Sequence, residues 1–132
     1  MKRALIVIGV SLSLSLVVGV APVAAHQRIE PTHVTINASA TQVDDGQKVT
    51  FKGKLKSDWK KCRSWRLVKL KNAGGKLVKS KKTRENGRYK FSMRPDATKG
   101  WKVVFSGRKW GTHPHVHRCL GSSSRTIRVR VN

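Results

Sequence analysis

Three histidines recur at alternate positions near the carboxyl end of the chain, and this spacing suits metal binding. His113, His115 and His117 would point to one side of an extended segment, where imidazole nitrogens could hold Cu(II) or Zn(II). His26 would become the amino-terminal residue after the cleavage described below, and its α-amino group and imidazole form a copper-chelating pair. One hypothesis is therefore a copper-binding protein. Pro114 interrupts the segment, and a polar exposed loop is the alternative interpretation.

Lysine and arginine occupy the outward positions of two segments, 47–56 and 88–94, that alternate between apolar and polar residues as half-buried strands do. We expect the two strands to be neighbours in one sheet and to share one cationic surface, here called the basic face. Such a face would bind polyanions: phosphate-rich wall polymers, anionic lipid headgroups, acidic polysaccharide or, non-specifically, nucleic acid. The alternative is a solvated surface that keeps a structural domain soluble. The basic face consists of Lys48, Lys52, Lys54, Lys56, Arg88, Lys90 and Arg94.

Two of the four tryptophans, Trp59 and Trp110, lie in connections flanked by lysine and arginine. Exposed tryptophan beside cations can stack on sugars or bases, and we expect Trp110 with Arg108 and Lys109 to form a second polyanion-binding patch. The alternative is that both indoles cover the open end of the fold. Trp101 is expected in the core.

Residues for catalysis are scarce. The six carboxylates are scattered mostly over turns, and the chain has no G-x-S-x-G, no H-E-x-x-H and no phosphate-binding loop. We expect a protein that is not an enzyme and that has no cofactor, unless the histidines bind copper.

The first 25 residues have the pattern of a secretory signal peptide. Lys2 and Arg3 precede an apolar run from 4 to 20, and the small residues of 23–25 predict cleavage after Ala25. An uncleaved anchor is the alternative. The remaining residues, 26–132, are long enough for one domain with a modest core, and no membrane span remains after cleavage. We therefore expect a secreted or cell-envelope protein.

The net charge is extreme. The chain has 29 basic and 6 acidic residues, and removal of Lys2 and Arg3 leaves a net charge of about +21. Self-repulsion of this size opposes compaction, and an anionic partner would explain why it is tolerated.

Two cysteines, Cys62 and Cys119, are present, and in an exported chain a disulfide between them is the expectation. It would stabilise the fold by about 4 kcal/mol on the chain-entropy description. Two free thiols or a metal-binding pair are the alternatives.

Strand-like segments alternate with turn residues over most of the chain, which predicts an all-β fold. Asn86-Gly87 is typical of a tight hairpin turn, and 26–31 has the look of a loose lead-in. The longest connection, 107–124, is expected to be a functional or disordered loop, which the disulfide would tie to the connection before the third strand. We predict an antiparallel β-sandwich of seven strands between about 32 and 131. The strands are 32–40, 47–56, 65–71, 76–82, 88–93, 101–105 and 125–131.

Several of these motifs together resemble a known group of proteins. V-T-F-K-G-K-L in 49–55, V-K-L in 68–70 and T-R-E-N-G-R-Y-K-F in 83–91 are similar to secreted bacterial Ig-like β-sandwiches, among them carboxypeptidase-regulatory-like and transthyretin-like modules. The two cysteine positions resemble exported actinobacterial versions. The resemblance implies a non-catalytic surface or accessory domain. The density of lysine and arginine exceeds what such domains require, and fold alone does not assign a function.

Overall fold

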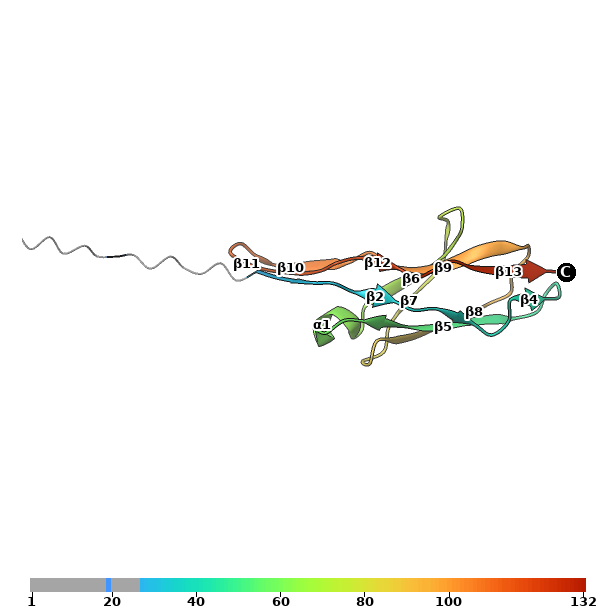
Figure 1. Cartoon of the computed structure of the whole chain (residues 1–132), viewed down its shortest axis with the longest axis horizontal. Coiled ribbons are helices and arrows are strands. Elements are labelled where there is room, and N and C mark those ends of the chain that lie inside the picture. Colours follow the sequence, from blue (N-terminus) through green and yellow to red (C-terminus); the bar gives the residue numbers. More distant parts are fainter. Residues whose placement is uncertain (1–18, 20–26) are drawn as a thin grey trace, which may run out of the picture.

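The computed structural model describes residue 19 and residues 27–132 (Figure 1). The expected signal peptide and His26 lie outside the described residues. Within the described part of the chain, no helix has the length and apolar character needed to cross a membrane.

Two sheets pack face to face, and Figure 1 shows them as two layers. In the first sheet, β5 is central, with β2 and β3 on one side and β8 on the other. The strands of this sheet are β2 (His33–Val34), β3 (Asn37–Ala38), β5 (Val49–Lys56) and β8 (Arg88–Met93).

The second sheet has the order β4-β13-β9-β6-β7, and β12 pairs with β9. Sheets of this kind, with the third, sixth and seventh main strands facing the second and fifth, have the immunoglobulin-like arrangement. The prediction of an all-β sandwich is confirmed. The strands are β4 (Gln42–Val43), β6 (Leu67–Asn72), β7 (Leu77–Lys82), β9 (Lys99–Phe105), β12 (Ser122–Ser123) and β13 (Ile127–Val131).

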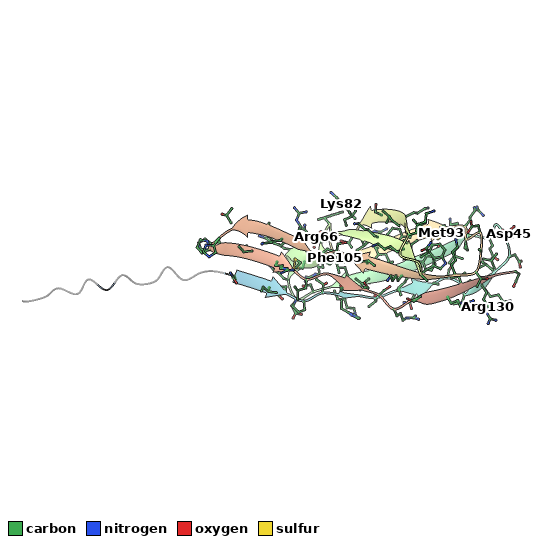
Figure 2. All side chains as sticks on the ribbon, turned by 90° about the horizontal axis from the view of Figure 1, so that it is seen from above. Asp45, Arg66, Lys82, Met93, Phe105 and Arg130 are labelled. Atoms are coloured by element: carbon green, nitrogen blue, oxygen red, sulfur yellow. A yellow bond between two sulfur atoms is a disulfide. The ribbon has the colours of Figure 1, made fainter. Side chains whose placement is uncertain are left out.

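A third, three-stranded sheet extends from one end of the sandwich, as Figure 1 shows. It consists of β1 (Gln27–Glu30), β10 (Arg108–Thr112) and β11 (His115–Cys119). The expected long loop is therefore a hairpin, and the expected lead-in is a strand parallel to β11. Both predictions were wrong: β1 pairs with β11 across more than eighty positions of sequence, whereas β10 and β11 pair locally around the turn at 113–114. Asp45 and Arg130 mark the opposite end of the molecule in Figure 2.

The predicted count of seven strands was also wrong, since the described residues contain thirteen strands and one short helix, α1 (Lys60–Arg63). The first predicted strand is divided into β2 and β3, because Thr35 and Ser39 bond to β5 through their side chains. The Lys54 N–H donates to Thr35 Oγ1 at 3.0 Å, and the Thr50 N–H donates to Ser39 Oγ at 2.9 Å. The chain then crosses to the other sheet, where β4 runs parallel to β13. The fold is therefore not purely antiparallel.

The Asn86-Gly87 turn does not close a hairpin, because β7 and β8 belong to different sheets. Gly87 adopts a φ of 83°, and its N–H donates to the Arg84 carbonyl at 3.0 Å. The predicted turn is therefore correct in its local geometry, and it serves as a crossover between the layers. This crossover carries Arg84 to the edge of the basic face.

Apolar side chains from both sheets fill the space between the layers. Phe51 and Phe91 face each other across β5 and β8, and Trp101 packs against Phe51 with ring centroids 5.9 Å apart. Trp101 is 2% exposed, which confirms its predicted place in the core. The other fully buried positions of the strands include Val34, Val49, Leu55, Val68, Leu70, Val103 and Val129.

Tyr89 crosses the central strand of the first sheet at the one position where β5 has no side chain. Its hydroxyl donates to the Thr35 carbonyl at 2.5 Å, and burial raises the pKa of Tyr89. Gly53 lies opposite Tyr89, and a Cβ there would collide with both the Thr35 carbonyl and the Tyr89 hydroxyl. Glycine at 53 is therefore a packing requirement of the strand that supports the basic face.

Gly53→Ala is expected to lower the free energy of unfolding by about 3 kcal/mol, because backbone on one side leaves the added methyl no room to move. Urea denaturation followed by fluorescence measures the change. Gly74→Ala is the matched control, since its Cβ would lie 3.4 Å from Asn72 Oδ1 and meet nothing closer. Equal stability of the two variants would contradict the packing argument.

Candidate polyanion-binding face

The basic face is built on the pairing of β5 with β8. In the register of these strands Lys52 lies directly opposite Lys90, and Lys54 lies directly opposite Arg88. Directly opposed residues of a sheet project to the same side, so each row places two cations against each other. The prediction that these two strands are neighbours is confirmed.

Polar residues of β2 and β3 extend these rows on the other side of β5. Asn37 lies opposite Lys52, and His33 lies opposite Lys56. Together these strands form a shallow hollow of ≈ 550 Å³. Six cationic residues line it, together with Thr35, Asn37, Gly53 and Tyr89; the cations are Lys52, Lys54, Lys56, Arg84, Arg88 and Lys90.

Acidic side chains do not neutralise this surface. In residues 27–132 the ion pairs are Arg28–Glu30, Lys60–Glu85 and Lys99–Asp96, and none of them includes a member of the basic face. Glu85 lies three positions before Arg88, but Lys60 Nζ donates a hydrogen bond to its carboxylate at 2.7 Å. That hydrogen bond and the charge of Lys60 lower the pKa of Glu85. In the described residues, the acidic side chains of these ion pairs are therefore engaged elsewhere than on the basic face.

Two members of the predicted face lie apart from the central hollow. Lys48 precedes β5 and Arg94 follows β8, and both line a separate hollow of ≈ 480 Å³ with Lys79 of β7. The Arg94 guanidinium also donates to the Gly46 carbonyl at 2.5 Å, which holds it against the turn before β5. The basic face is thus a central group of five with an outlying pair.

Arg84 is a residue that the sequence interpretation left out of the face. It lines the central hollow, a second hollow of ≈ 580 Å³ between β7 and β8, and a third of ≈ 820 Å³ around Trp65. Its position next to Glu85 in a turn motif suggested only a connecting role. The sequence does contain a signal for including Arg84 in the face, because Arg84 is a cation in a turn that directly follows a lysine-rich strand.

The disulfide joins α1 to β11, with the Cys62 and Cys119 Cα atoms 5.5 Å apart and 57 positions between them in sequence. The predicted pairing is confirmed, and it brings the two connections to the same end of the sandwich. A disulfide indicates an oxidising compartment.

Beside the disulfide, Trp59 and Trp110 stack on each other with ring centroids 5.2 Å apart. His117 stacks on Trp110 at 5.9 Å, and the Arg28 guanidinium lies 4.3 Å from the Trp59 ring. Arg28, His117 and Trp110 form one row across β1, β11 and β10. Both indoles are half-buried and pack against the main core, which favours the interpretation that they cover this end of the fold.

The expected second patch is divided between two faces of β10. Arg108 and Trp110 project to one side, and Lys109 projects to the other, where it lies opposite Arg118 of β11. Near this patch, the Arg66 guanidinium lies 5.7 Å from the Trp110 ring. The pKa of Arg66 is lowered, mainly by burial and to a smaller extent by the charge of Arg108.

The three histidines do not share one strand face. His113 lies in the turn between β10 and β11 at a cis bond to Pro114, whereas His115 and His117 lie in β11. Within residues 27–132, no three histidine, cysteine or carboxylate side chains are grouped to hold a metal ion. The copper hypothesis also needs His26, which lies outside the described residues, so it stays a prediction.

No family model matches the chain, and no curated protein matches it in sequence. Among solved structures, a superoxide reductase (neelaredoxin) from Ignicoccus hospitalis is similar, with 9% identity, a TM-score of 0.50, and coverage of 76% of this chain and 82% of that one. The CARDB domain of PF1109 from Pyrococcus furiosus has 13% identity and a TM-score of 0.47, covering 79% and 96% of the two chains. The sulfur carrier protein SoxY from Chlorobium limicola f thiosulfatophilum has 14% identity and a TM-score of 0.46, covering 80% and 84%. Likeness at such identities concerns the fold alone.

Lys90→Glu is expected to raise the free energy of unfolding by about 0.5 kcal/mol, because it replaces a like-charged pair with Lys52 by an opposite-charged one. Thermal unfolding at low salt measures the gain. Lys76→Glu makes the same change of net charge in an exposed turn and is the control. An equal gain in stability in both variants would show that the effect comes from the lower net charge and not from the pair of Lys52 and Lys90.

Replacement of both cysteines, Cys62→Ala/Cys119→Ala, is expected to lower the free energy of unfolding by about 4 kcal/mol. It should also loosen the Trp59–Trp110 stack, because the bond ties α1 to β11. Urea denaturation and near-ultraviolet circular dichroism measure the two effects. Unchanged stability together with an unchanged aromatic spectrum would contradict the role assigned to the disulfide.

Proposed function

We propose that the protein is an extracytoplasmic binding module without catalytic activity, which contacts an anionic polymer or surface of the cell envelope through the basic face. The observation that carries the proposal is the direct opposition of Lys52 with Lys90 and of Lys54 with Arg88. Opposed like charges destabilise a sheet. A bound polyanion would neutralise them and turn the repulsion into binding free energy.

The shape of the face also favours a long partner. The central hollow is open and shallow, and it adjoins the hollows at β7 and at Trp65 through Arg84. A linear polymer can place successive anionic groups along such a surface, whereas a small ligand is usually enclosed in a pocket. Release of the polymer's counterions would then supply much of the affinity.

The compartment and the fold agree with this function. A disulfide between Cys62 and Cys119 suits a protein exported by the expected signal peptide, and the immunoglobulin-like strand order suits the resemblance to secreted bacterial surface modules. The finer assignment to one of those module families is part of the proposal.

The proposal is tested by measuring affinity for heparin chains of defined length between about 50 and 200 mM NaCl. The variants are Lys52→Gln/Lys90→Gln and Lys54→Gln/Arg88→Gln. Each is expected to weaken binding about tenfold at the lower salt and to reduce the slope of log K against log salt by about two, one for each cation removed.

Arg128→Gln/Arg130→Gln is the matched control, because it removes two exposed cations from β13 in the other sheet. It is expected to change the affinity by no more than about twofold, since screening weakens charges that do not touch the ligand. If the control weakens binding as much as the face variants do, net charge alone attracts the polymer. That result would favour a structural domain whose charge keeps it soluble.

A further inference from the structure

Trp65 combines two unusual properties. Its φ is 57°, and among the described residues it is the one non-glycine residue with a positive φ. Its side chain is also 60% exposed, the largest exposed fraction of the exposed large apolar residues among residues 27–132. Bulky side chains avoid the left-handed region because Cβ approaches the following carbonyl. The expected place of Trp65 at the start of the third strand was therefore wrong.

The backbone on both sides of Trp65 is held by the buried residue Thr83. Thr83 Oγ1 donates to the Arg63 carbonyl at 2.7 Å and accepts from the Arg66 N–H at 2.9 Å. The Ser64 hydroxyl also donates to the Glu85 carbonyl. These bonds impose the backbone conformation, and none of them involves the indole. Asparagine or glycine would meet the same requirement with less strain, so the fold does not require tryptophan here.

The indole lies in a hollow of ≈ 820 Å³ with charged and polar neighbours. Lys54 and Arg84 belong to this hollow and also to the central hollow of the basic face, so the two surfaces are continuous. The remaining lining residues are Lys60, Arg63, Glu85 and Asn86.

The matching ligand has a flat apolar face with both anionic and hydroxyl groups around it. An indole presents a broad apolar surface, the cations attract anionic substituents, and the oxygens of Glu85 and Asn86 accept hydrogen bonds from hydroxyls. A sugar ring of an acidic polysaccharide has all three features. Polyphosphate lacks the ring, and single-stranded nucleic acid is usually bound by several aromatic platforms, whereas this hollow contains one aromatic residue.

We propose that Trp65 is a stacking platform for a sugar ring of an acidic polysaccharide whose anionic groups continue across the basic face. This inference rests on the proposed function, and it narrows the partner from polyanions in general to glycans. The strain at Trp65 is then explained by binding, in keeping with the tendency of strained residues to lie at functional sites.

The test compares Trp65→Asn with the unaltered protein, using two probes of similar charge: heparin and linear polyphosphate. Heparin affinity should fall about tenfold, because loss of one stacking contact weakens binding by about that factor. Polyphosphate affinity should stay within about twofold, because polyphosphate has no ring to stack. Heparin should also shift the fluorescence of the unaltered protein, and this shift should be reduced in the variant. The unfolding temperature of the variant should be unchanged or higher. Leu77→Asn, which removes an exposed apolar side chain from β7, is the control and should change neither affinity.

Four results would overturn the inference. Unchanged heparin affinity in Trp65→Asn would show that Trp65 is not a stacking platform, while the proposal of polyanion binding by the basic face would still stand. Equal losses for heparin and polyphosphate would reduce Trp65 to a structural role. Single-stranded DNA that binds more tightly than heparin at the same salt, and depends on Trp65, would replace the glycan by a nucleic acid. If neither heparin nor polyphosphate binds the unaltered protein, the proposed function fails together with this inference.

Discussion

The pairing of β5 with β8 is the constraint on which the rest of the structure depends. On its inner side, Phe51 and Phe91 meet across the strands and anchor the core. On its outer side, the same register forces Lys52 against Lys90. Because side chains alternate strictly along a strand, the core and the cationic rows cannot be separated: a shift of one residue would bury the lysines and expose the phenylalanines. Burial of apolar surface therefore holds together a set of charges that repel each other.

The end of the sandwich near α1 is stabilised differently. There the disulfide joins the helix to β11, and Trp59 stacks on Trp110 and contacts His117 of the added sheet in a tilted arrangement. Arg28 of β1 completes the cluster through its contact with Trp59. Covalent, aromatic and cation–π contacts thus fix a hairpin that projects beyond the two main sheets, where little core is available.

Positive charge and backbone strain are concentrated where the chain crosses from one sheet to the other. The crossover from β7 to β8 carries Arg84 to the meeting point of three hollows, and Thr83, in the same segment, holds Trp65 in its unfavourable conformation. Unfavourable features of this kind persist because the surrounding bonds over-determine them. Their gathering on one side of the molecule is what the proposed glycan site would explain.

Local pattern was sufficient for the elements that alternate strictly. The alternation of 47–56 and 88–93 predicted which residues face the core, and two cysteines in a chain expected to be exported predicted the disulfide between Cys62 and Cys119. Tertiary structure alone decided three features: the pairing of β1 with β11, the hairpin within 107–124, and the exposure of Trp65. The pairing of β1 and the conformation of Trp65 depend on partners distant in sequence, which a local pattern does not contain. The hairpin pairs locally, but its mostly polar residues have no apolar–polar alternation that would predict strands. Trp65 shows this most clearly, because its conformation is imposed by Thr83, eighteen residues later.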